Sequence, residues 1–144
     1  MTTNDSLQQL KIMRAVALEC DSLYERVQAL GNVAGLALGN AKRSQITGLE
    51  SIANSALKVG DVRDYLKLRT ARQREWQTEG AGQQVLTFIE QDLGAARSRV
   101  CKMLNIEDPG QRQAVYLMLI REFVRQLAAH YEFVVKFGPR ATPV

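Results

Sequence analysis

Apolar residues recur every three or four positions along almost the whole chain, and this spacing restricts the fold to helices. The three prolines, Pro109, Pro139 and Pro143, lie at or beyond the ends of the periodic segments, so none of them interrupts a segment. β-branched residues are scattered instead of alternating, and no strand is predicted. The sequence therefore predicts an all-α fold.

Glycine, proline and capping residues divide this pattern into about five helices. The expected helices span about 6–30, 44–57, 61–76, 82–104 and 110–137. We expect Ser6 and Asp61 to cap the first and third helices, Val59 and Gly60 to close the second, and Asp108-Pro109 to start the last. The segment from Gly31 to Gly39 is open between helix and loop, and a weakened helix ending near Gly39 is favoured.

A chain of 144 residues fits one hydrophobic core, and 46% hydrophobic with 24% charged residues is the balance of a globular protein. We expect residues 1–138 to form a single helical-bundle domain and residues 139–144 to form a flexible C-terminal tail. The two long helices at 82–104 and 110–137 are joined by a short loop and should pack antiparallel. The first helix should complete the bundle, and the two short helices should lie across it.

The sequence also predicts a cytoplasmic protein. It contains no apolar run of membrane-spanning length, and its N-terminus lacks the layout of a signal peptide. Cys20 and Cys101 stand alone in apolar helical contexts, so buried free thiols are expected rather than a disulfide or a metal site.

The net charge of +4 is concentrated in one part of the chain. Residues 1–41 hold three bases and four acids, residues 42–74 hold eight bases and three acids, and residues 75–144 hold eight of each. The middle block therefore carries the whole excess, and its eight bases are Lys42, Arg43, Lys58, Arg63, Lys67, Arg69, Arg72 and Arg74. An anionic partner is expected to bind there.

Catalytic chemistry finds little support in the sequence. His130, the single histidine, has no carboxylate at helical contact spacing. Asp61 and Asp64 fall in the first turn of a helix, where the helix dipole already favours acids. The Gly80-Ala-Gly82 stretch lacks the preceding strand and the lysine of a phosphate-binding loop. We therefore expect no enzyme activity, no catalytic or metal-binding residue and no cofactor.

Arginine outnumbers lysine in the basic block, and its planar fork suits phosphate oxygens. Arg63 and Lys67 are four residues apart and Arg74 is seven further on, so a single exposed ridge of cations is predicted. Tyr65 and Trp76 are candidates for stacking on bases, although core packing is the stronger expectation for Tyr65. These features predict salt-sensitive binding to a nucleic-acid backbone with weak sequence preference.

The stretch Arg43-Ser-Gln-Ile-Thr-Gly-Leu-Glu-Ser-Ile-Ala-Asn-Ser, followed by Asp61-Val-Arg-Asp-Tyr-Leu-Lys-Leu-Arg-Thr-Ala-Arg, resembles the small helical subunit of type III CRISPR effector complexes. Residues 82–93, Leu119-Ile-Arg-Glu-Phe123 and Tyr131-Glu-Phe133 are similar to that family's long helix and its closing helix. The resemblance covers about residues 42–134. Thr47 departs from it, because the family often has a basic residue at that position.

The resemblance implies a non-catalytic subunit, present in several copies, that supports guide RNA and target RNA inside a multi-subunit effector complex. Base pairing by the guide would supply sequence recognition, and other subunits would cleave RNA. Lys42, Arg43 and Gln45 match the family's basic Ser-Gln segment, and Arg63, Lys67, Arg69 and Arg72 match its basic helix. With Arg74 from the charge pattern, these residues form the expected RNA-backbone contacts.

Two other function classes stay open. One is a scaffold or adaptor that binds proteins through the apolar heptad face around Leu93. The other is a helical-bundle enzyme of the chorismate mutase kind, whose arginines converge on a small anion in a pocket. An exposed ridge of cations favours RNA binding, whereas a pocket lined by three or more arginines favours the enzyme.

Overall fold

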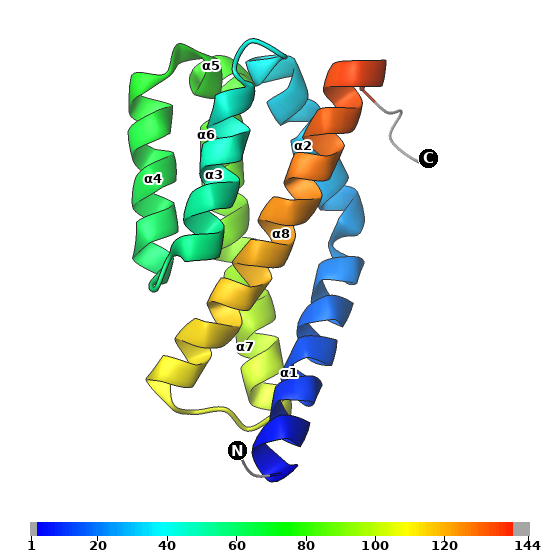
Figure 1. Ribbon diagram of the computed structural model, residues 1–144, viewed down its shortest axis with the longest axis vertical. Helices are drawn as coiled ribbons and strands as arrows, with labels where there is room; N and C mark the ends of the chain where they lie inside the picture. The colour runs from blue at the N-terminus through cyan, green and yellow to red at the C-terminus, as the bar shows by residue number, and fades with distance from the viewer. Residues whose placement is uncertain (1–2, 140–144) are drawn as a thin grey trace.

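The computed structural model describes residues 3–139, and within this range every regular element is a helix (Figure 1). The elements are α1 (Thr3–Ser22), α2 (Tyr24–Leu38), α3 (Arg43–Ser55), α4 (Val59–Arg72), α5 (Arg74–Gln77), η1 (Thr78–Gly80), α6 (Ala81–Thr87), η2 (Phe88–Leu93), α7 (Gly94–Met103) and α8 (Pro109–Phe137). The all-α prediction is confirmed. The expected number of about five helices is close, because α6, η2 and α7 follow one another as one long helix. Apart from Pro139, the predicted C-terminal tail lies outside the described residues.

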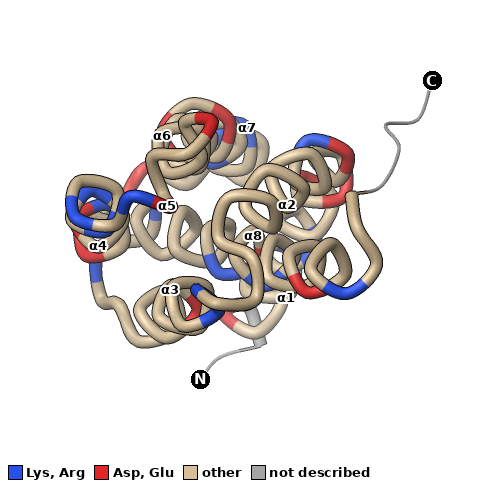
Figure 2. The backbone as a smooth tube through the Cα atoms, turned by 90° about the horizontal axis from the view of Figure 1, so that it is seen from above, with Lys and Arg blue, Asp and Glu red and all other residues tan. Residues whose placement is uncertain are grey.

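The long helix α8 runs through the middle of the bundle and contacts α1, α2, α3, α4, η2 and α7 (Figures 1 and 2). The helices α1 and α2 run in the same direction as α8, whereas α7 runs antiparallel to it as expected (Figure 1). The prediction that the two short helices lie across the bundle was wrong. Instead, α3 and α4 form an antiparallel pair alongside it, because each buries one full apolar side against a neighbour.

The core is built mainly around α8. Eleven of its residues are buried, and spacings of three and four connect those from Tyr116 to Val134 along one side of the helix. The largest fully buried side chains come from several elements and include Trp76, Tyr116, Phe123, Tyr131 and Leu49. Each such side chain contributes about 1.5–3 kcal/mol when it is removed from water. Cys20 and Cys101 are buried free thiols, as the sequence predicted.

Local sequence signals set both ends of α8. The Asp108 carboxylate accepts a hydrogen bond from the Gln111 amide at 2.9 Å, and Pro109 occupies the first turn. Gly138 ends the helix with a φ of +88°, a conformation that favours glycine. The predicted start and stop of this helix are therefore confirmed.

The segment from Gly31 to Gly39 is helical up to Leu38, and Gly39 ends the helix with a φ of +57°. A Cβ atom on Gly31 would lie 2.3 Å from Cβ of His130, and one on Gly35 would lie 2.4 Å from Cγ1 of Val134. These two glycines therefore let the backbone of α2 approach α8 closely.

Three helix boundaries differ from the sequence prediction. The expected first helix is broken at Leu23, and it begins by Thr3, so Ser6 lies inside it and is not its cap. Val59 and Gly60 form the first turn of α4 instead of closing α3, and the Val59 amide donates to Oε1 of Gln113 at 3.5 Å. This side-chain acceptor on α8, which the local sequence does not reveal, satisfies one of the free amides at the start of α4.

The third boundary is at Gln73, because α4 ends at Arg72 whereas the predicted helix continues to Trp76. Gln73 adopts an extended conformation with φ −104° and ψ +114°, and the short helix α5 follows at a new angle. The turn allows Trp76 to enter the core, where it is completely buried. Tertiary packing of this one side chain thus overrides the local helical pattern.

Candidate nucleic-acid interface

Helix α4 presents cations on both sides of its buried face. Val59, Val62 and Leu66 point into the core. Successive residues of an α-helix turn by about 100°, so Lys67 lies on one side of this face and Arg69 and Arg72 lie on the other. The predicted single ridge of Arg63, Lys67 and Arg74 was wrong in one respect, because α4 ends at Arg72 and Arg74 begins α5. Arg69 and Arg72 follow the opposite edge of α4. In Figure 2 this helix lies at the periphery of the molecule.

Lys67, Arg72 and Arg74 are exposed, and none of them forms an ion pair with a described residue. Arg74 begins α5, beyond the break at Gln73, so it does not continue the row of Arg63 and Lys67. These three side chains keep their full charge available to an external anion.

Arg69 is held by an aromatic ring instead of an acid. Its guanidinium carbon lies 5.1 Å from the centroid of the Tyr65 ring. The Tyr65 hydroxyl donates to the backbone oxygen of Gln45 at 3.5 Å, so the ring is fixed against α3. Such a contact orients an arginine without neutralising it, and the fork can still bind a phosphate.

Lys67 also lines an open groove of about 540 Å³ between α4 and α6. Gln77 and Gln83 contribute amide groups to the walls, and the Gln77 amide donates to the backbone oxygens of Thr70 and Ala71. The walls combine these amides and one cation with apolar surface, and a cation beside amide groups suits a phosphate or a ribose.

The cations at the start of α3 already have acidic partners. Arg43 donates to Glu132 and to Oδ1 of Asn40, and its guanidinium lies 5.9 Å from the Tyr131 ring centroid. The hydrogen bond to Glu132 raises the pKa of Arg43. Lys42 lies 3.8 Å from a carboxylate oxygen of Glu75. These residues tie α3 to neighbouring helices and are weaker candidates for phosphate contacts.

Gln45 and Trp76 have structural roles. Gln45 is only 8% exposed, and its side-chain oxygen accepts a hydrogen bond from Nε1 of Trp76 at 3.2 Å. The expectation that Gln45 contacts RNA is therefore corrected, because its amide is buried and engaged. Trp76 is equally unable to stack on a base, since it is inaccessible to solvent.

Arg63 differs from the other cations of α4 in its burial and its contacts. It is half-buried, and its guanidinium carbon lies 5.8 Å from the ring centroid of Tyr116. Arg97 of α7 lies 4.9 Å from the same centroid. Sequence reasoning missed Arg97, because it lies in a charge-balanced part of the chain and joins Arg63 only through tertiary packing.

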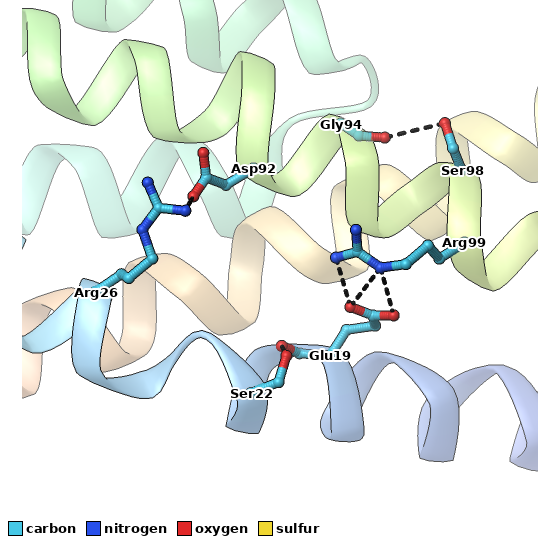
Figure 3. Close-up of polar contacts among 7 residues, drawn as sticks. All are labelled: Glu19, Ser22, Arg26, Asp92, Gly94, Ser98 and Arg99. Atoms are coloured by element: carbon cyan, nitrogen blue, oxygen red, sulfur yellow. Dashed lines mark hydrogen bonds and ion pairs between the residues drawn. The ribbon is translucent and has the colours of Figure 1, made fainter.

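Several cations outside the basic block meet carboxylates. Arg26 pairs with Asp92 and Arg99 pairs with Glu19, which join α2 to η2 and α1 to α7 (Figure 3). The Arg99 guanidinium makes hydrogen bonds of 2.8, 3.0 and 3.2 Å to both oxygens of Glu19. Arg125 pairs with Glu122 on α8. Lys11, Arg14, Lys102 and Lys136 are further exposed cations, and none of them forms an ion pair with a carboxylate in the described part of the chain. They come from three helices.

Among the described residues, no group of three or more histidine, cysteine, aspartate or glutamate side chains is arranged to hold a metal ion. Within the same residues, none of the helices has the length and apolarity that crossing a membrane requires. Comparisons with protein-family models, with curated protein sequences and with solved structures find no match to this chain.

Proposed function

We propose that this protein is a non-catalytic RNA-binding small subunit of a type III CRISPR effector ribonucleoprotein. In this proposal α4 and the start of α5 contact the backbone of guide and target RNA. The observation that carries it is the group of Lys67, Arg69, Arg72 and Arg74, which stand within eight residues and have no carboxylate partner among residues 3–139. We name these four residues the α4 cation group.

Contacts of this kind give affinity without reading bases. Each cation that neutralises a phosphate releases a counterion, so affinity falls as salt is added. The guide RNA would supply sequence recognition by base pairing, which agrees with the sequence resemblance described above. The proposal includes neighbouring subunits, several copies of this chain in one complex, and a cytoplasmic location.

Fluorescence anisotropy with a labelled single-stranded RNA and with a guide–target duplex tests the proposal at several salt concentrations. The test variant is Lys67→Ala/Arg69→Ala/Arg72→Ala/Arg74→Ala. The control variant is Lys11→Ala/Arg14→Ala/Lys102→Ala/Lys136→Ala, which removes the same charge from exposed positions elsewhere. Circular dichroism establishes that both variants keep their helix content.

We expect the test variant to lose RNA binding and the control variant to keep most of it. For single-stranded RNA, the slope of log affinity against log salt should flatten by about 0.7 for each lost phosphate contact. Equal losses in both variants would show that net charge alone attracts RNA, and the proposed interface would be wrong. The same titration on a complex assembled with partner subunits measures the contribution of multivalency.

A scaffold or adaptor function is the second candidate, and one observation favours it. Helix α1 exposes Leu7, Leu10, Met13 and Leu18, each at least half exposed. The apolar heptad face around Leu93, which the sequence analysis proposed for protein binding, is not available to a partner. Leu93 is 1% exposed and belongs to the core. Leu10→Ser/Leu18→Ser should abolish association with other protein chains in sedimentation experiments if the scaffold reading holds, while RNA binding is unchanged.

The small-anion enzyme is less well supported. Arg121 and Arg125 line a groove of about 410 Å³ between α1, α3 and α8, but both are engaged. Arg121 donates to the backbone oxygens of Ala53 and Ala56 at 2.9 and 3.0 Å, and Arg125 pairs with Glu122. Neither fork is free to clamp a substrate in this groove.

A further inference from the structure

Two arginines from distant parts of the chain meet at one buried tyrosine. Arg63 of α4 and Arg97 of α7 lie 5.8 and 4.9 Å from the centroid of the Tyr116 ring. Tyr116 is 1% exposed, and its hydroxyl donates to the backbone oxygen of Ile89 at 2.7 Å. The ring is therefore fixed, and it fixes the position of both guanidinium groups.

Both arginines carry a buried donor that has no acceptor. The Nε atoms of Arg63 and Arg97 are inaccessible to solvent and form no hydrogen bond. Other guanidinium groups in the described part of the chain do find acceptors: Arg43, Arg99 and Arg125 bind carboxylates, and Arg112 and Arg121 bind backbone oxygens. Polar atoms removed from water are usually hydrogen-bonded, so these two donors are exceptions. Both side chains are only partly buried, which leaves the outer N–H groups of each guanidinium to bind an acceptor from outside the chain.

Two further cations lie one helical turn from residues of this cluster. Lys67 follows Arg63 by one helical turn, and Arg112 precedes Tyr116 by one turn. Neither Arg63 nor Arg97 forms an ion pair with a described carboxylate. A π-helical turn, η2, supplies the Ile89 oxygen that holds Tyr116, and turns of this kind are frequent at functional sites.

We propose that Arg63 and Arg97 bind one phosphate group beside the ring of Tyr116, at the junction of α4, α7 and α8. The oxygens of a phosphate accept hydrogen bonds from the forks of both arginines and neutralise their charge together. The faces of the tyrosine ring attract the cations but provide no acceptor for their N–H groups.

This inference goes beyond the proposed function, because Arg97 lies outside the basic block and the site takes a single phosphate. Two sources share the required chemistry. One is a backbone phosphate of RNA, and the other is a free phosphate or a small phosphorylated molecule.

Nuclear magnetic resonance of the arginine Nε–H groups tests the site directly. Inorganic phosphate is titrated into the full-length, isotope-labelled protein at constant ionic strength, with sodium chloride as the balancing salt. Arg63→Gln and Arg97→Gln assign the two signals, because each removes one of them. We expect these two signals to shift with a saturating dependence on phosphate, while the signal of exposed Arg14 does not.

Variants then separate specific binding from general attraction. Arg97→Lys keeps the charge but removes the fork, and we expect it to weaken phosphate binding at least 10-fold with little change in melting temperature. Arg14→Gln removes the same charge as Arg97→Gln from an exposed site and should leave the affinity unchanged. Shifts that grow linearly with phosphate, or that appear equally at all arginines, would overturn the proposal.

A short RNA oligonucleotide identifies the source of the phosphate. If it shifts the Arg63 and Arg97 signals and displaces inorganic phosphate, the backbone of RNA occupies the site. If phosphate binds but the oligonucleotide leaves both signals unchanged, the ligand is a small phosphorylated molecule. The inorganic phosphate titration does not involve RNA, so its failure is distinguishable from a failure of RNA binding at the α4 cation group.

Discussion

Gly31 and Gly35 show how single atoms control the packing of this bundle. At both positions an added Cβ would lie less than 2.5 Å from a side-chain carbon of α8. Real Cβ atoms are not found at such distances, so α2 or α8 would have to move. The same glycines weaken an isolated helix by about 1 kcal/mol each, and close packing offsets this loss.

Gly31→Ala should therefore lower the free energy of unfolding by about 1–3 kcal/mol, measured by urea denaturation, because the extra methyl group overpacks the contact with His130. Gly60→Ala is the matched control. Nothing lies within 4 Å of a Cβ at Gly60, so alanine should leave stability unchanged or raise it by up to about 1 kcal/mol. Equal effects at both sites would show that helix propensity, and not packing, decides the result.

Cys20 gives the protein a predictable response to alkaline pH. Burial, followed by the charges of Glu122 and Glu19, raises the pKa of Cys20 to about 12, from an ordinary value of 9.0. The folded state therefore holds the thiol proton more tightly than the unfolded state. Stability is unaffected below about pH 9 and falls as pH rises from there towards 12.

Between pH 8 and pH 10 this thiol should reduce the free energy of unfolding by about 1 kcal/mol. We expect Cys20→Ala to be less stable than the wild-type protein at both pH values, because the substitution leaves a cavity. Its free energy of unfolding should nevertheless fall by less between pH 8 and pH 10. Urea denaturation at the two pH values measures the difference. An identical loss in both proteins would assign the response to other groups, such as Tyr131, whose pKa is also raised by burial.

At the scale of elements, the boundaries that could be predicted are those set by local chemistry. Asp108, Pro109 and Gly138 act within their own turns, and the sequence located both ends of α8. The breaks at Leu23 and Gln73 were missed. At Gln73 the cause is the burial of Trp76, a contact between distant segments that spacing along one helix does not encode.

Gln45 connects α3 to α5 through the Trp76 side chain. Gln45→Ala should lower the free energy of unfolding by about 1–3 kcal/mol, because the buried indole N–H loses its acceptor. Ser44→Ala, at the exposed neighbouring position, is the control and should change stability little. If Gln45→Ala instead weakens RNA binding at full stability, Gln45 belongs to the interface after all.

At the scale of the whole molecule, the sequence located the charge excess correctly but not its arrangement. Local spacing suggested one ridge of cations, whereas the structure divides them between two edges of α4, with Arg74 beyond a break. Acids that neutralise Arg43 and Lys42 come from residues far along the chain, Glu132 and Glu75. Which cations stay unpaired is a property of the fold and could not be deduced from the order of residues.

Ion pairs link the helices on the side of the bundle away from α4. The pairs shown in Figure 3 join α1 and α2 to η2 and α7. In each pair the arginine is more than half exposed and the carboxylate is largely buried, and the pairing removes the arginine's charge from the local surface. These pairs neutralise Arg26 and Arg99, whereas no cation of the α4 cation group has a carboxylate partner among residues 3–139.

The π-helical turn between α6 and α7 also fixes how α7 is rotated about its own axis. A π turn contains one residue more than an α-helical turn, and one residue corresponds to a rotation of about 100°. Loss of a single residue between Phe88 and Leu93 is absorbed when the π turn becomes an α-helical turn, so Arg97 still faces Tyr116 and Arg99 still faces Glu19. An added residue in α-helical geometry would instead turn both arginines by about 100°, so insertions, more than deletions or substitutions, are the sequence changes that this segment cannot accept.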